Sequence, residues 1–363
     1  MKELVLLGDE ALAIGALHAG VSGCFGYPGT PSTEILEYLV DNHESRGGPV
    51  AQWCANEKTA YESALGVSFS GKRAIVTMKH VGLNVAADPF MNSSLCQIKG
   101  GLICVVADDP SMHSSQGEQD TRYYADFAMV PLFEPTSQQE AYEMAAEAFD
   151  LSERFRVPVI MRMVTRLAHS RAVVKVADSS RPENALEKGI PSDWMLLPAL
   201  ARKNYAKMIE KQGPLSDWSA SYPRNVLVKN EKRRDLAIIT SGLGRNYFEE
   251  NLADFKAACG AAGLPTTLHV ACMPLPTALL SEVFASADAV LVIEEGMPFL
   301  ERQLTGVIPG SRRVIGKMTG HLPRAGELNP DTVRAALSKA LSERGLAALA
   351  PKKTALDSFT PPE

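Results

Sequence analysis

Cysteine is scarce in this chain, and no two cysteines are spaced as a metal-binding pair. The six cysteines among the 363 residues lie at positions 24, 54, 96, 104, 259 and 272. Zinc sites and iron–sulfur clusters need closely spaced cysteines, such as Cys-x-x-Cys, so we expect neither from this chain alone. Isolated thiols in a chain of this length also indicate a reducing, cytoplasmic compartment rather than a disulfide framework.

Long apolar runs and an excess of positive charge are missing as well. No apolar stretch approaches the length that crosses a bilayer, and the short run Leu4–Leu7 is followed too soon by acidic residues for a signal peptide. The chain has 37 Lys and Arg against 42 Asp and Glu, a formal net charge of −5. We therefore expect a soluble protein that binds neither membrane nor nucleic acid. Its length predicts about two domains.

Short apolar runs alternate with helical patterns over residues 1–170. We expect strands at Leu4–Leu7, Cys24–Tyr27, Ala51–Ala55, Ala74–Met78, Leu102–Ala107 and Val157–Met163. Cap residues mark the helices between them, with Asp9, Thr30 (followed by Pro31 as the first helical residue), Asn56 and Ser137 as expected N-caps. This alternation predicts a doubly wound α/β fold, in which helices cover both faces of a mostly parallel sheet.

Residues 236–345 repeat this alternation and predict a second, smaller α/β domain. Its strands are expected at Leu236–Thr240, Thr267–Val270, Val290–Glu294 and Arg313–Ile315, and Asn329 caps the last helix. The connector, 171–235, holds 13 basic against 8 acidic residues and carries Trp194 and Trp218. We expect a basic, ordered arm packed on a neighbouring surface. Residues 346–363 are expected to form a tail.

The turn Gly26–Glu34 is the most informative segment. It joins the end of a strand to a capped helix, and open parallel sheets bind ligands at the carboxyl ends of their strands, against helix N-termini. Thr30 is explained slightly better as a helix cap alone. The alternative is that Thr30 and the neighbouring N–H groups face a bound carboxylate.

Glu57 begins the helix that follows the next strand. A glutamate there interacts favourably with the helix dipole, by about 0.3–1 kcal/mol, and the residue alone favours this explanation. The alternative is a half-buried carboxyl group with a raised pKa that shares a proton with a ring nitrogen of a cofactor.

Two further polar segments, Lys79–Asn84 and Asp108–Asp120, also follow strands. Asp108 and Asp109 could ligate a metal, but the spacing supports no closed site, and we expect no metal ligand in this chain. The Gly-x-Gly-x-x-Gly, P-loop, Gly-x-Ser-x-Gly and His-Glu-x-x-His motifs are absent. Four successive strand ends with polar or glycine-rich loops are stronger evidence for a ligand site than any one loop.

Together these segments resemble indolepyruvate:ferredoxin oxidoreductase alpha subunits, among the thiamine-diphosphate-dependent 2-oxoacid:acceptor oxidoreductases. The resemblance covers about residues 1–345 and is carried by Gly26–Ser32, Asn56–Lys58, Met78–Asn84, His113–Gln116, Ile293–Gly296 and Gly316–Pro323. It implies a pyrimidine-binding domain at 1–170 and a transketolase-C-terminal-like domain at 236–345. Glu57 would be the catalytic residue, which bonds the aminopyrimidine ring of thiamine diphosphate and promotes its activation. The resemblance and the positions of the loops place Glu57, Gly29 and Asn84 at the cofactor, and Thr30, His80, His113 and Ser114 at the substrate.

The sequence departs from this family in having no Gly-Asp-Gly motif for the diphosphate and Mg²⁺. Its only Gly-Asp, Gly8-Asp9, is followed by Glu10. We therefore expect thiamine diphosphate to be shared with a diphosphate-binding partner subunit, with Mg²⁺ and iron–sulfur clusters on partner chains. A gamma-type subunit, coenzyme A and an electron acceptor (ferredoxin, or a flavin/iron–sulfur subunit) are implied too.

Three functions follow, in this order. The first is a subunit of a multi-chain oxidoreductase that oxidatively decarboxylates a 2-oxo acid, by resemblance an aryl pyruvate, to its acyl-CoA. The second is a subunit of a split non-oxidative decarboxylase, which a cluster-free partner would favour. The third is a non-catalytic assembly subunit.

Overall fold

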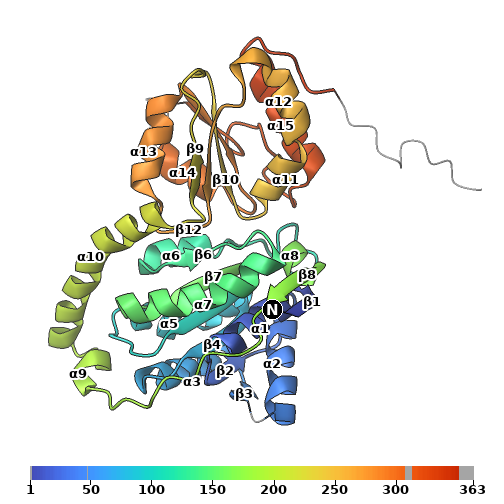
Figure 1. Cartoon of the computed structure of the whole chain (residues 1–363). Coiled ribbons are helices and arrows are strands. Elements are labelled where there is room, and N and C mark those ends of the chain that lie inside the picture. Colours follow the sequence, from blue (N-terminus) through green and yellow to red (C-terminus); the bar gives the residue numbers. More distant parts are fainter. Residues whose placement is uncertain (1, 47, 307–312, 351–363) are drawn as a thin grey trace, which may run out of the picture.

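The computed structural model describes residues 2–46, 48–306 and 313–350, and comprises two lobes, each with its own sheet (Figure 1). The N-terminal lobe contains a seven-stranded sheet of order β12-β6-β7-β5-β4-β2-β3. All neighbours are parallel except the short β12, which pairs antiparallel with β6. In chain order the strands are β2 (Gly23–Gly26), β3 (Val50–Trp53), β4 (Ala74–Lys79), β5 (Leu102–Asp108), β6 (Leu132–Phe133), β7 (Val159–Val164) and β12 (Cys272–Met273).

Helices cover both faces of this sheet, as the continuous apolar strands predict. Ile75, on β4, belongs to the core formed with α1, α2 and α7, whereas the adjacent Val76 belongs to the core formed with α3, α5 and α6. The helices of this lobe are α1 (Gly8–His18), α2 (Thr33–Arg46), α3 (Glu57–Phe69), α4 (His80–Val85), α5 (Ala87–Ser93), α6 (Arg122–Ala128), α7 (Gln138–Phe155) and α8 (Thr165–His169).

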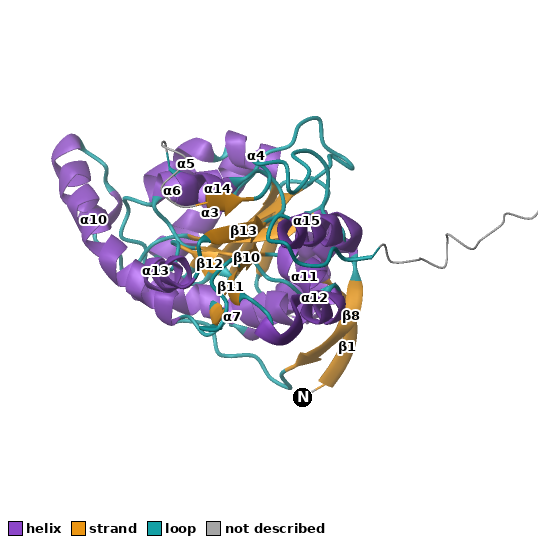
Figure 2. Ribbon diagram, turned by 90° about the horizontal axis from the view of Figure 1, so that it is seen from above, coloured by secondary structure: helices purple, strands orange, loops and turns teal. Residues whose placement is uncertain are grey.

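The first strand does not join the parallel sheet. β1 (Lys2–Leu7) pairs antiparallel with β8 (Arg171–Val176) in a separate two-stranded sheet, which lies on the side of the molecule opposite α10 (Figure 2). The expected cap at Asp9 is wrong as well. A cap at Asp9 would start the helix at Glu10, but the helix begins two residues earlier, at Gly8, and the side chain of Glu10 accepts the Leu7 N–H at 2.8 Å.

The C-terminal lobe is built on a five-stranded sheet of order β14-β13-β10-β11-β9. Its strands are β9 (Val226–Val228), which is antiparallel, and the parallel β10 (Ala237–Ser241), β11 (Thr266–Val270), β13 (Ala289–Ile293) and β14 (Arg313–Ile315). One face packs on α11 (Gly244–Glu250), α12 (Leu252–Cys259) and α15 (Pro330–Ser342), and the other on α13 (Thr277–Ser286) and α14 (Phe299–Thr305). A short 3₁₀ helix, η1, spans Gly260–Ala262. Both sheets are therefore covered on two faces, as expected of a doubly wound α/β fold.

Residues 171–235 include β8 of the two-stranded sheet and β9 of the five-stranded sheet. Between β8 and β9 lie α9 (Pro191–Trp194) and the long α10 (Pro198–Ser221), which runs along the outside of the two lobes (Figure 1). Trp194 contacts Phe69 with ring centroids 5.1 Å apart, and Trp218 contacts Phe133 at 5.7 Å. The two tryptophans thus attach this segment to the N-terminal lobe.

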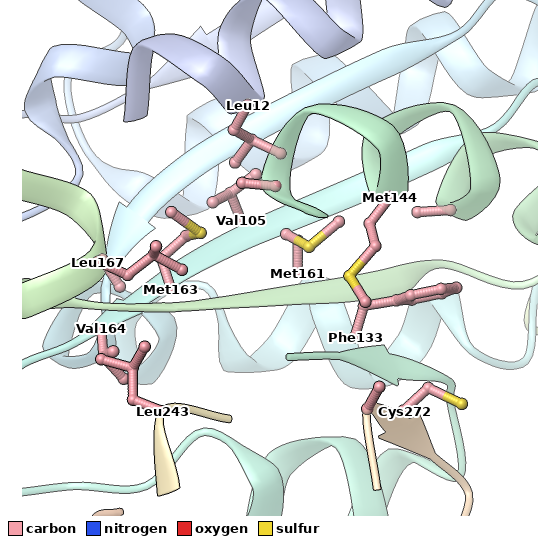
Figure 3. Close-up of a cluster of buried hydrophobic side chains, with 14 of the residues drawn as sticks. Leu12, Val105, Phe133, Met144, Met161, Met163, Val164, Leu167, Leu243 and Cys272 are labelled. Atoms are coloured by element: carbon pink, nitrogen blue, oxygen red, sulfur yellow. The ribbon is translucent and has the colours of Figure 1, made fainter. Parts of the chain in front are cut away.

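The core continues from one lobe into the other. In Figure 3, Leu243 lies near Val164, and Cys272 lies beside Phe133. This shared apolar packing, together with β12, fixes the C-terminal lobe on the ends of strands β5, β6 and β7. Among the described residues, no helix is long and apolar enough to cross a membrane.

Candidate active site

The carboxyl ends of β2, β3, β4 and β5 meet at one edge of the seven-stranded sheet, and the first loop there is the turn after β2. Its helix begins at Thr33, whose hydroxyl accepts the Gly29 N–H at 2.9 Å. The carbonyl of Gly29 accepts the backbone N–H of Ser32 and its hydroxyl, which closes a turn before the helix starts. The expected N-cap at Thr30 and helical start at Pro31 are therefore wrong. Thr30 is exposed, and the Thr30–Pro31 peptide bond is cis.

The loop after β5 folds back onto this turn. Ser114 donates from its hydroxyl to the Thr30 carbonyl at 3.2 Å. The Lys79 ammonium, at the end of β4, donates to the carbonyl and the hydroxyl of Ser114 at 3.0 and 3.1 Å. A Cβ added at Gly29 would lie 3.1 Å from the Lys79 Cβ, so the glycine allows close approach of the turn. The structure thus brings together Gly29, Thr30 and Ser114 around Lys79.

Asp109 holds the Ser114 end of this loop in place. Its carboxylate accepts the Ser114 N–H at 2.8 Å and the hydroxyls of Ser115 and Thr165 at 2.6 and 2.7 Å. Burial alone would raise the pKa of Asp109, but these hydrogen bonds and the nearby Lys79 lower it to about 2. The sequence marks Lys79 and Asp109 only as members of polar strand-end segments, and their roles depend on contacts between separate loops.

Glu57 is the first residue of α3, which is capped by Asn56 through a 2.9 Å bond to the Thr59 N–H. The partly buried Glu57 side chain lies against Gly82 in α4. A Cβ at Gly82 would come within 2.5 Å of Glu57 Oε1, so the glycine makes room for this carboxylate. No described residue forms a hydrogen bond or ion pair with the carboxylate. The helix cap is thus supplied by Asn56, and the charge of Glu57 remains available to a ligand.

The two polar residues of α4 differ in exposure. His80 is buried, its Nε2 lies 3.1 Å from the Gly117 carbonyl, and its Nδ1 has no partner among the described residues. Asn84 is exposed and accepts a 2.7 Å hydrogen bond from the Tyr124 hydroxyl. Both residues lie on α4, the helix that also carries Gly82, and Gly82 lies against Glu57. His80 and Asn84 are therefore in the same part of the site as Glu57.

His113 extends toward the C-terminal lobe. Its Nε2 lies 3.4 Å from a carboxylate oxygen of Glu327, in the C-terminal lobe, and its side chain is half-exposed. Of the predicted substrate residues, His113 is thus directed toward the other lobe, whereas its neighbour Ser114 contacts Thr30.

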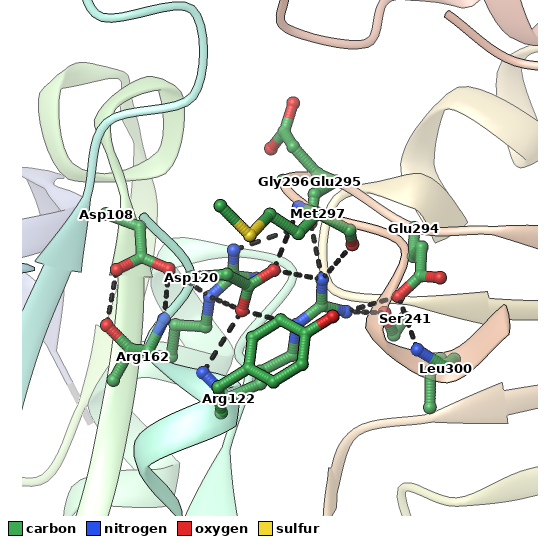
Figure 4. Close-up of polar contacts among 12 residues, drawn as sticks. Asp108, Asp120, Arg122, Arg162, Ser241, Glu294, Glu295, Gly296, Met297 and Leu300 are labelled. Atoms are coloured by element: carbon green, nitrogen blue, oxygen red, sulfur yellow. Dashed lines mark hydrogen bonds and ion pairs between the residues drawn. The ribbon is translucent and has the colours of Figure 1, made fainter. Parts of the chain in front are cut away.

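The ends of β5 and β7 carry a buried group of charges that the sequence did not reveal (Figure 4). Arg122 donates to Asp120 at 2.5 Å and to Glu294, in the C-terminal lobe, at 2.8 Å. Arg162 donates to Asp108 at 2.6 Å. We refer to Asp108, Asp120, Arg122, Glu134, Arg162 and Glu294 as the interlobe charge network.

In this network the oxygens of Asp108 are occupied by Arg162 and Thr121, not directed toward an ion. Burial raises the pKa of Asp120, but Arg122 and Arg162 lower it to about 2. The two arginines therefore keep Asp120 charged between the lobes, and the network is separate from the open edge at Glu57.

These features define a doubly wound α/β protein with a ligand site at its strand ends, and solved structures share the fold. A 2-oxoglutarate:ferredoxin oxidoreductase from Magnetococcus marinus matches with a TM-score of 0.72 and 18% identity, over 93% of this chain and 65% of that one. A family model described as pyruvate flavodoxin/ferredoxin oxidoreductase, thiamine diphosphate-binding, matches residues 14–199. The chain belongs to this family, which confirms the resemblance seen in its motifs.

Curated relatives extend the similarity into the C-terminal lobe. The indolepyruvate oxidoreductase subunit IorA of Archaeoglobus fulgidus is 39% identical over 345 residues, which cover 94% of this chain and 54% of the relative. The subunit of the same name from Methanothermobacter thermautotrophicus is 37% identical over 93% of this chain and 54% of its own length. The chain thus spans about half the length of the curated relatives it matches.

Proposed function

We propose that this chain is a subunit of a multi-chain, thiamine-diphosphate-dependent oxidoreductase that oxidatively decarboxylates a 2-oxo acid. The observation that carries the proposal is the Glu57 carboxylate, which lies over Gly82 with no partner among the described residues. Family membership supplies the cofactor class. The names of the relatives favour an aryl pyruvate, such as indolepyruvate, as the substrate.

The residues at the sheet edge fit the pyrimidine end of thiamine diphosphate. Glu57 would bond a ring nitrogen through its free carboxylate, and the absence of a side chain at Gly82 leaves space for that contact. When bound, the cofactor would supply a nucleophilic carbon that adds to the 2-oxo group and a cationic ring that accepts the electron pair released by decarboxylation. The task of Glu57 is to hold and return a proton at its carboxylate, which is general acid–base chemistry. Gly29 and Asn84 would contact the cofactor at either side of this carboxylate.

The turn at Thr30 is suited to the substrate. A 2-oxo acid carries a carboxylate, and Thr30 presents an exposed hydroxyl close to Ser114 and the Lys79 ammonium. A cation and two hydroxyls are complementary to an anion. We infer that these groups orient the carboxylate, with His80 and His113 lining the pocket farther along.

A partner chain would complete the site. Exposed apolar side chains surround the open edge, at Tyr27, Val81, Val85 and Met112, and such residues in one region are typical of an interaction surface. The partner would bring the diphosphate site with its Mg²⁺. The oxidative reaction further requires a gamma-type subunit, iron–sulfur clusters, ferredoxin or a flavin/iron–sulfur subunit as electron acceptor, and coenzyme A as acyl acceptor.

The test is a Glu57→Gln substitution in the assembled complex. We expect 2-oxoacid-dependent reduction of the acceptor to fall by about 10²–10⁴-fold, because the amide cannot exchange the proton. Assembly and thermal stability should stay unchanged, since the carboxylate has no described partner to lose. Glu62→Gln, on the exposed side of the same helix, is the matched control and should keep full activity. Undiminished turnover of Glu57→Gln would reject the proposal and favour a non-catalytic assembly subunit.

A further inference from the structure

Three ionisable side chains meet behind the Thr30 turn, outside the site described above. Asp9 comes from the first turn of α1, Glu34 from the first turn of α2, and His169 from the end of α8. One carboxylate oxygen of each acid and one ring nitrogen of the histidine lie within 4.8 Å of one another. Three separate helices therefore direct potential metal ligands to one point.

Asp9 distinguishes this group from an ordinary cluster of acids. Its side chain is fully buried, and neither carboxylate oxygen has a hydrogen-bond partner among the described residues. Leaving a buried carboxylate without a partner is costly. In the interlobe charge network, by contrast, Asp108 and Asp120 both contact arginines. Asp9 does not cap α1 either, since Leu7 is the N-cap residue and neither oxygen of Asp9 accepts a hydrogen bond from the helix start.

The other two ligands form a rim that an ion can reach. The side chains of Glu34 and His169 are each 35% exposed, and their Oε1 and Nε2 atoms are already 3.5 Å apart. The second oxygen of Glu34 is buried and has no partner among the described residues. Asp9 thus forms the floor of a small polar site that opens to solvent on one side.

We propose that Asp9, Glu34 and His169 bind a divalent cation of the Zn²⁺ or Mn²⁺ type. Two carboxylates neutralise its charge, and the imidazole favours these ions over Mg²⁺ or Ca²⁺. Bonds of about 2 Å place zinc ligands roughly 3.3 Å apart. The Glu34 and His169 atoms, 3.5 Å apart, already have nearly this spacing, and no pair of ligand atoms exceeds 4.8 Å, so only small side-chain movements are needed when the ion binds. Three protein ligands leave one position for water.

The site has a positioning role and does not depend on the proposed cofactor. An ion there joins the beginnings of α1 and α2 to the end of α8. One of its ligands, Glu34, lies four residues from Thr30 along the chain. It would fix the base of the turn that carries Thr30. Loss of the ion should therefore loosen this turn while the rest of the fold remains.

The experiment measures ion binding to the full chain after treatment with EDTA. We expect one Mn²⁺ per chain by electron paramagnetic resonance, displaced by Zn²⁺, and a Zn²⁺-dependent rise in Tm of at least about 3 °C. Asp9→Asn keeps the shape of the buried side chain but removes a charged ligand, and His169→Ala removes the nitrogen ligand. Each should weaken binding at least 10-fold.

Matched variants separate this site from adventitious binding. Glu37→Gln removes an exposed acid from the same helix as Glu34 and should bind the ion as the unmodified chain does. The proposal is overturned if no ion binds, or if Asp9→Asn and His169→Ala bind as tightly as the unmodified chain. Binding that is lost only in Cys54→Ser would assign the ion to that partly exposed thiol and would equally overturn it.

Discussion

At the carboxyl edge of the seven-stranded sheet, the charged side chains on one half are paired and buried, and those on the other half are open to a ligand. At the ends of β3 and β4, Glu57 has no described partner and Lys79 contacts only a loop. At the ends of β5 and β7, Asp108 and Arg162 are buried and paired, and the network continues through Arg122 into the C-terminal lobe. The difference follows from what covers each half, because the C-terminal lobe lies over β5, β6 and β7 and leaves the other strand ends open.

This contrast distinguishes residues that hold the molecule together from residues available for chemistry. A buried ion pair that is fully hydrogen-bonded fixes two surfaces in one arrangement, and losing one partner is costly. An unpaired, partly exposed carboxylate adds little to stability but can bind a ligand. The closed half therefore fixes the lobes, and the open half is the part that a ligand or another chain can complete.

The largest expected effect on stability is that of Arg122→Met. The guanidinium is fully buried and donates to Asp120, Glu294 and the carbonyl of Glu295. Methionine fills similar space but leaves the buried Glu294 without its cation and Asp120 with only Arg162, 3.9 Å away. We expect the free energy of unfolding to fall by about 3–5 kcal/mol, measured by urea denaturation.

The control for this prediction is Glu57→Gln, which should change stability by less than about 0.5 kcal/mol. Equal losses in the two variants would contradict the division into a closed and an open half.

The next effect concerns Glu295, which is buried beside the network. Burial, together with Glu327, raises its pKa to about 7, so the folded chain keeps a proton that the unfolded chain releases near pH 4.5. The unfolded state then binds fewer protons, and this group's contribution to stability falls as pH rises from about 4.5 to 7 and is constant above that. Glu295→Gln removes the effect. As the pH rises from 4.5 to 7.5, the free energy of unfolding of Glu295→Gln should increase by about 3 kcal/mol relative to that of the unmodified chain.

The measurement is the difference between the two proteins in urea denaturation across this pH range. His269 acts in the opposite direction, since burial lowers its pKa to about 3 and its contribution is lost as pH falls below 6.5. Both proteins contain His269, so its contribution cancels in the difference. A difference that does not vary with pH would mean that Glu295 is charged in the folded state, as Asp120 is.

Local patterns in the sequence predicted most of the fold. The expected caps at Asn56, Ser137 and Asn329 are confirmed, and each side chain bonds a backbone N–H three residues on. These caps need only neighbouring atoms. The predictions at Asp9 and Thr30 failed because the helices begin at other residues: α1 starts at Gly8 and α2 at Thr33, and the side chains of Glu10 and Thr33 accept the N–H groups of Leu7 and Gly29. The short strand β12 could not be predicted, because its pairing with β6 joins segments about 140 residues apart.

In the candidate site, too, the sequence predicts the positions set by single strands but not the contacts between separate segments. Because parallel strands end at one edge, the sequence could place Thr30, Glu57, His80 and Ser114 in one region. It could not predict that Lys79 contacts Ser114. The pairing of Arg122 with Glu294, 172 residues away, was equally invisible, because such contacts depend on how loops and lobes pack.

The smallest expected effect is that of Lys58→Met at the open edge. Lys58 follows Glu57, and its ammonium lies 3.1 Å from Asp88, but the two side chains are 45% and 68% exposed. Water and salt screen such a pair, and fixing two flexible side chains costs entropy, so we expect urea denaturation to show almost no loss of stability. Arg122 contacts two carboxylates, at 2.5 and 2.8 Å, in a buried setting, whereas Lys58 contacts one at 3.1 Å in an exposed setting, so the gap between the two losses reflects burial together with the number of contacts. If Lys58→Met cost as much as Arg122→Met, the open edge would be held by its own charges, and exposure could no longer explain why the two halves differ.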